Sequence, residues 1–100
     1  MKTLEAMKQI GVVGAGQMGA GIAQVAASVA KKEVVLFDLS EEQLQKGVAG
    51  IEKSLAKLES KGRLEGITAE EARRNVTTTT NIQDLSSCDF VVEAIVENVA

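Results

Sequence analysis

The sequence predicts an α/β fold built on a parallel sheet. Along a chain of 100 residues, short apolar segments alternate with helical patterns, which is typical of strands joined by crossover helices. The length suits one domain, and the 45% share of hydrophobic residues is enough for a core. The segments expected to form strands are Ile10–Val13, Val34–Phe37, Val76–Thr79 and Phe90–Val96.

The first two strands are joined by a helix predicted over Met18–Ala30. Its apolar residues recur at spacings of three and four, which is the period of a helix with one buried face. The stripe expected to face the core, including the Met18 side chain, is Met18, Ile22, Val25, Ala26 and Val29. The remaining Ala and Gly residues allow the helix to lie close to the sheet.

Ser40 begins the longest predicted helix, and Gln43 three residues later completes a capping box. Gly62 is a natural residue to end this helix. A second capping box, Thr68 with Glu71, predicts a further short helix. The apolar residues of the long helix fall on one stripe, made of Leu44, Val48, Ile51, Leu55 and Leu58.

Composition excludes several classes of function. The chain has no His, so it offers no Ser–His or Cys–His pair and no imidazole base, and with one Cys we expect no metal site. The net charge of −3 and the two Phe as sole aromatics disfavour nucleic acid. No apolar run approaches the roughly 18 residues of a membrane span. Cys88 has no basic neighbour that would favour a thiolate.

The compartment follows from the same features. The first nine residues alternate polar and apolar residues and do not resemble a signal peptide. A single unpaired Cys88 is typical of a reducing compartment. We therefore expect the cytoplasm or, for a processed form, the mitochondrial matrix.

One motif carries chemistry: Gly14-Ala15-Gly16-Gln17-Met18-Gly19 matches G-x-G-x-x-G. Gly14 permits a tight turn, Gly16 allows a pyrophosphate to approach the backbone, and Gly19 lets the helix pack on the strand. The pyrophosphate is expected at the N-terminus of the following helix, where free N–H groups favour an anion.

Asp38 ends the second predicted strand, 19 residues beyond Gly19. At this spacing a carboxylate binds the adenosine ribose in a Rossmann fold, so we favour a dinucleotide site over a plain turn with a solvated Asp. A 2′-phosphate would be repelled by Asp38, and Leu39 and Ser40 supply no cation for it. The pattern therefore predicts NAD as the cofactor in preference to NADP.

Several segments together resemble the 3-hydroxyacyl-CoA dehydrogenase family. The resemblance runs from Gln9 onward, and Phe90–Asn98 is its most specific part. The other segments that carry it are the glycine turn through Gln24, Val34–Asp38, Gly50–Leu55 and Thr77–Thr80.

This resemblance implies a fold and an activity. Members of the family have an N-terminal Rossmann domain, with a helical hairpin inserted after the second strand, followed by a helical dimerisation domain. Residues 1–100 would then be a partial NAD-binding domain, truncated at its C-terminus and lacking the second domain, from a protein that is a homodimer at full length. The family interconverts (S)-3-hydroxyacyl-CoA and 3-oxoacyl-CoA with NAD in fatty-acid metabolism, including β-oxidation.

The resemblance also implies roles for individual residues. Gly14, Ala15, Gly16, Gln17, Met18 and Gly19 would bind the pyrophosphate, Asp38 the ribose, and Glu97 the nicotinamide half of NAD. Ser54 and Lys61 would contact the CoA moiety of an acyl-CoA substrate. The catalytic His of the family, with its assisting Glu, Ser and Asn, would follow position 100, so no catalytic residue is assigned in this chain.

The chain departs from the family pattern at one turn, and three alternative functions stay open. The family usually ends its first helix on a Gly just before the second strand, where this chain has Val29-Ala30-Lys31-Lys32-Glu33, so we expect a different turn geometry. The chain could instead be a non-catalytic nucleotide-binding module or the Rossmann domain of another 3-hydroxy-acid dehydrogenase. An assembly module would use strand Phe90–Val96 and the apolar stripe of the 44–58 helix to pair with another chain.

Overall fold

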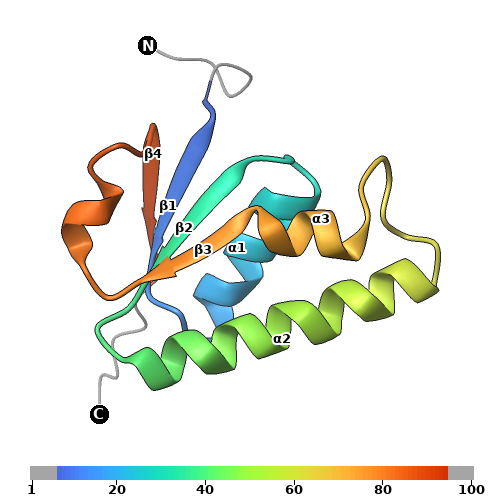
Figure 1. Ribbon diagram of the computed structural model, residues 1–100, viewed down its shortest axis with the longest axis horizontal. Helices are drawn as coiled ribbons and strands as arrows, with labels where there is room; N and C mark the ends of the chain where they lie inside the picture. The colour runs from blue at the N-terminus through green and yellow to red at the C-terminus, as the bar shows by residue number, and fades with distance from the viewer. Residues whose placement is uncertain (1–6, 95–100) are drawn as a thin grey trace.

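A computed structural model describes residues 7–94. It contains a sheet in which all strand pairs are parallel, in the order β3-β2-β1-β4 (Figure 1). The strands are β1 (Gln9–Val13), β2 (Glu33–Phe37), β3 (Val76–Thr79) and β4 (Phe90–Glu93). The parallel α/β prediction is confirmed. The last two residues of the predicted strand Phe90–Val96 lie outside the described residues.

Three helices cover one face of the sheet in the described part of the chain. They are α1 (Gln17–Ser28), α2 (Glu41–Ser60) and α3 (Ala69–Arg74), the last two forming the expected helical insertion between β2 and β3. The short 3₁₀ helix η2 (Ile82–Leu85) packs Leu85 against Val35 and Phe37 on the opposite face. The larger core lies between the sheet and the three helices.

The order of the strands in the sheet is not their order in the chain. The chain moves outward from β1 through β2 to β3 and then returns to pair β4 with the other side of β1. The order therefore changes direction at β1, and in open parallel α/β sheets ligands bind at the carboxyl ends of the strands at such a point. The glycine turn follows β1 and lies at this edge.

The helix caps form as predicted, apart from one of the two hydrogen bonds expected between Ser40 and Gln43. Thr68 and Glu71 make both bonds of their box at the start of α3. Ser40 Oγ accepts from the Gln43 backbone N–H at 3.2 Å, as expected. The reciprocal bond predicted for the Gln43 side chain is wrong, because the Ser40 N–H donates to Asp38 Oδ1 instead, at 2.9 Å.

The face that α1 turns to the core differs from the prediction. Met18, Val25 and Val29 are 50%, 56% and 73% exposed, so the predicted apolar stripe, Met18 included, largely faces outward. The buried positions of α1 are instead small: Gly19, Ala23, Ala26, Ala27 and Ser28. Small side chains allow the helix axis to lie close to the sheet. The closeness of this packing, and not the hydrophobicity of the side chains alone, therefore determines which face of α1 is buried.

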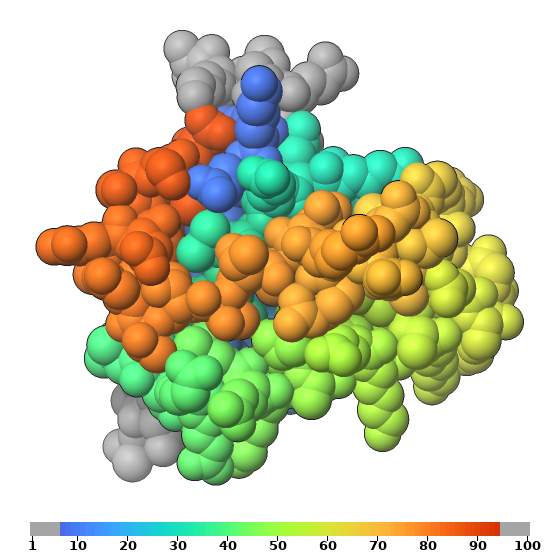
Figure 2. Space-filling view, in the orientation of Figure 1, coloured from blue at the N-terminus to red at the C-terminus, as the bar shows by residue number. Residues whose placement is uncertain are grey.

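The apolar stripe of α2 is confirmed. Leu44, Ile51 and Leu55 are fully buried in the main core, and Val48 and Leu58 are partly covered. Figure 2 shows α2 and α3 packed into one continuous layer. This stripe is therefore occupied within the chain itself, which removes one of the two surfaces that the assembly alternative required.

The turn between α1 and β2 keeps a left-handed residue without a glycine. Lys31 has φ +57°, a conformation that disfavours a side chain. The Lys32 N–H donates to the Ala26 carbonyl at 3.0 Å and closes the turn. The expectation of a different geometry was wrong, because the closing backbone bond holds Lys31 in the region that a glycine would adopt freely.

Within residues 7–94, no helix combines the length and the apolar character needed to cross a bilayer.

Replacing Lys31 with Gly should stabilise the chain, because glycine relieves the left-handed strain. We expect the free energy of unfolding to rise by about 0.5–1 kcal/mol. Urea unfolding followed by far-UV circular dichroism measures this change. Lys31→Ala is the matched control, since it removes the same side chain but keeps the strain; an equal gain from Lys31→Ala, or no gain from Lys31→Gly, would refute the explanation.

Candidate functional site

The turn after β1 is built from glycines with distinct tasks. Gly14 has φ +104°, and its N–H donates to the Phe37 carbonyl at 2.8 Å, which joins the ends of β1 and β2. A methyl group at Gly19 would overlap the carbonyl oxygen of Gly14. These contacts hold the start of α1 directly against the turn.

Asp38 is fixed at the carboxyl end of β2 by two backbone donors. Its Oδ2 accepts from the Ala15 N–H at 2.9 Å and its Oδ1 from the Ser40 N–H at 2.9 Å. A carboxylate oxygen has about two lone-pair sites, so each oxygen retains an acceptor position. The side chain is half-buried and stands beside the glycine turn, as the motif predicts.

The turn leaves space for an anion at the N-terminus of α1. A methyl group at Gly16 would meet no atom within 4 Å, so the backbone there is open to a ligand. The first turn of α1 contains no acidic residue, and the free N–H groups of a helix start favour negative charge. The residues present therefore fit a dinucleotide pyrophosphate.

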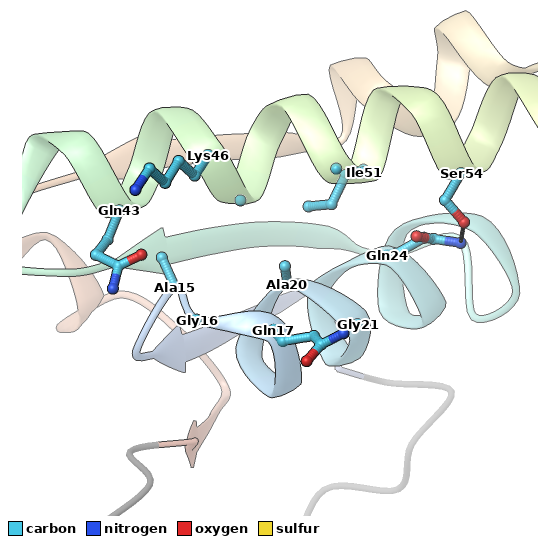
Figure 3. A pocket seen from close by; sticks show the side chains of 12 residues that line it. Ala15, Gly16, Gln17, Ala20, Gly21, Gln24, Gln43, Lys46, Ile51 and Ser54 are labelled. Atoms are coloured by element: carbon cyan, nitrogen blue, oxygen red, sulfur yellow. Dashed lines mark hydrogen bonds between the residues drawn. The ribbon is translucent and has the colours of Figure 1, made fainter.

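A groove of about 490 Å³ runs between α1 and α2. Figure 3 shows Gln43 and Lys46 at the end next to Ala15 and Gly16, and Gln24 with Ser54 at the opposite end. Gln24 Nε2 donates to Ser54 Oγ at 2.9 Å and closes that end. The groove thus begins at the glycine turn and follows the two helices away from it.

A glycine allows α2 to approach the turn closely at this end of the groove. A methyl group at Gly47 would lie 2.9 Å from the Ala15 carbonyl oxygen and 3.7 Å from Ala20 Cβ. Any larger residue would push α2 away from α1. Gly50 lines the same groove but has open space beside it.

Comparison with known proteins agrees with this geometry. Residues 9–100 match the model of the 3-hydroxyacyl-CoA dehydrogenase NAD-binding domain. The chain belongs to this family. With the family established, NAD is the cofactor, and the alternative of another class of 3-hydroxy-acid dehydrogenase is not supported.

Individual relatives show the extent of the similarity. A probable 3-hydroxybutyryl-CoA dehydrogenase of Deinococcus radiodurans is 51% identical over 90% of this chain and 32% of its own length. The human mitochondrial hydroxyacyl-coenzyme A dehydrogenase is 44% identical over 92% of this chain and 31% of its own length. The chain therefore spans about a third of these relatives.

A solved structure supports the same fold. The (S)-3-hydroxybutyryl-CoA dehydrogenase of Ralstonia eutropha superposes with a TM-score of 0.83 at 40% identity, over 93% of this chain and 32% of the other. The fold is thus of the Rossmann type found in these dehydrogenases.

The structure brings some of the predicted site residues together and not others. Gly14, Gly16, Gly19 and Asp38 meet at the ends of β1 and β2, and Ala15, Gly16 and Gln17 also line the groove. Met18 is exposed beside the turn. Glu97 lies outside the described residues.

The two residues expected to contact CoA are placed differently. Ser54 lines the groove. Lys61 is the exposed C-cap of α2 and is not among the groove residues. The two lie seven residues apart, so they share one side of α2 at a separation along the axis of about 10 Å.

Sequence reasoning missed the groove residues Gln24, Gln43, Lys46 and Gly47, although a signal existed. Along α2, the small and polar groove residues recur at helical spacing: Gln43, Gly47, Gly50 and Ser54. A stripe of this kind next to an apolar stripe indicates a second helix face in close contact with a partner. Here the partner is α1.

Cys88 does not contribute a nucleophile. Burial, followed by the charge of Asp89, raises the pKa of the thiol above its usual value, so it stays protonated at neutral pH. Within residues 7–94 there is also no group of His, Cys, Asp and Glu side chains that could hold a metal ion.

Gly19→Ala should destabilise the chain strongly, because the added methyl group would overlap the backbone carbonyl of Gly14 in the turn. We expect a loss of at least about 2–3 kcal/mol in the free energy of unfolding. Gly21→Ala, two residues further along α1, has open space and should instead gain up to about 1 kcal/mol from helix propensity. Thermal unfolding of both variants tests this contrast, and a stable Gly19→Ala chain would contradict the described packing.

Proposed function

We propose that this chain is the NAD-binding part of an oxidoreductase that interconverts (S)-3-hydroxyacyl-CoA and 3-oxoacyl-CoA. The observation that carries the proposal is that the glycine turn, Asp38 and a groove lined by Ser54 lie side by side. NAD, when bound, would accept the hydride that leaves C3 of the 3-hydroxyacyl group. The chain's own residues hold and orient the two ligands.

Each group has a separate task in this proposal. The open N-terminus of α1, at Gly16 and Gln17, binds the pyrophosphate, and Asp38 accepts hydrogen bonds from the adenosine ribose. Ser54 and Lys61 contact the CoA moiety from one side of α2, and Glu97 contacts the nicotinamide half. The position of Ser54 in the groove, hydrogen-bonded to Gln24, supports this arrangement.

Proton transfer belongs to residues that this chain does not supply. The chain has no His, and we propose that the general base lies in a further part of the protein, together with a dimerisation and substrate domain that makes it a homodimer. The relatives are about three times as long, which supports a second domain. We propose the cytoplasm as its compartment; the human relative is a mitochondrial protein.

The chain alone should bind NADH without turning over substrate. With acetoacetyl-CoA and NADH, absorbance at the NADH band should stay constant, because the proton donor is missing. Sustained oxidation of NADH would contradict the assignment of the chemistry to other residues. Failure to bind NADH at all would contradict the whole proposal.

Gly16→Ala should weaken NAD binding while leaving the fold intact. The new methyl group meets no protein atom within 4 Å, and φ −67° suits alanine, so stability should not fall. The same methyl group occupies the space where the pyrophosphate approaches the backbone. We expect a loss of NADH affinity of at least about 10-fold, or more than about 1.4 kcal/mol.

Isothermal titration with NADH, paired with thermal unfolding, separates these two effects. Unchanged NADH affinity in Gly16→Ala would show that the pyrophosphate does not lie against this turn.

A further inference from the structure

The α1–α2 groove has an uneven distribution of charge. Of the twelve described residues that line it, only Lys46 is charged. The far end is closed by the neutral pair Gln24 and Ser54. In a chain with a net charge of −3, a groove with a single positive lining residue favours an anionic group at one end of its ligand.

The positive end coincides with the start of α1. Figure 3 shows Lys46 and Gln43 beside Ala15 and Gly16. The N–H groups that open a helix and an ammonium group attract the same oxygens, and Gln43 adds an amide that can donate from the same side. Two elements far apart in the sequence thus present donors to one place.

We propose that Lys46 binds a phosphoryl group at this end of the groove, with Glu42 competing for its ammonium group. The inference rests on the proposed function and names a residue that the glycine motif and the predicted CoA contacts do not include. Both ligands of the proposed enzyme carry phosphates, so the group belongs to the pyrophosphate of NAD or to CoA.

Without ligand, Lys46 is engaged only weakly. Its Nζ lies 3.2 Å from Glu42 Oε1, and the two side chains are 70% and 77% exposed. Exposed pairs one helical turn apart contribute little to stability. Lys46 can therefore exchange this carboxylate for a phosphoryl oxygen without disturbing the fold, whereas Glu42 lowers the net attraction for the anion.

The test is calorimetric titration of the full chain and its variants with NADH and, separately, with CoA. Lys46→Gln should weaken binding of one or both by about 10-fold, since it removes a charged hydrogen bond to phosphate. Glu42→Gln should strengthen binding of the same ligand by about 2-fold, because the competitor is gone. Lys46→Arg should retain most of the affinity.

Lys53→Gln is the matched control: it removes the same charge from an exposed position of α2 outside the groove and should change neither affinity. An effect on NADH alone identifies the dinucleotide as the source of the phosphate, and an effect on CoA alone identifies CoA. Unchanged affinity of Lys46→Gln for both ligands, or an equal loss in Lys53→Gln, overturns the inference. Wild-type chain that binds neither ligand overturns the proposed function itself.

Discussion

The Asp38 carboxylate is the interaction on which the site depends. It accepts from the Ala15 N–H in the glycine turn and from the Ser40 N–H at the entry to α2, each at 2.9 Å. One side chain thus connects the loop after β1, the end of β2 and the start of the longest helix. Bonds from a carboxylate to backbone N–H groups are stronger than neutral ones. The same group that we propose binds the ribose therefore also orients the turn that we propose binds the pyrophosphate.

Two glycines allow α1 and α2 to pack closely against the turn after β1. Gly19 packs α1 onto the turn, and Gly47 brings α2 onto the Ala15 carbonyl. Each glycine weakens its helix by about 1 kcal/mol relative to Ala. In α2, burial of Leu44, Ile51 and Leu55 in the core offsets that loss. The result is a groove of about 490 Å³ that opens at the glycine turn, and we propose that a second ligand lies in it.

Much of this could be predicted from the sequence, because it depends on local chemistry. The strands, the cap at Thr68, the stripe of α2 and the pairing of the glycine turn with Asp38 all follow from short-range patterns. The buried face of α1 could not, since Ala and Gly prevailed over Met18 and Val25 through packing against the sheet. The Gln24–Ser54 bond spans 30 residues, and the left-handed Lys31 depends on a backbone bond that the finished turn supplies. These features depend on tertiary contacts, which local patterns do not contain.

The most direct test of the central claim is the relative affinity of the chain for NADH and NADPH. The chain contains no Trp and no Tyr, so the fluorescence of either reduced nucleotide can be followed with little background from the protein. Asp38 would repel a 2′-phosphate. The next two residues, Leu39 and Ser40, supply no positive charge to bind that phosphate. The account predicts that NADH binds more tightly than NADPH. Equal affinities, or tighter binding of NADPH, would contradict the role given to Asp38.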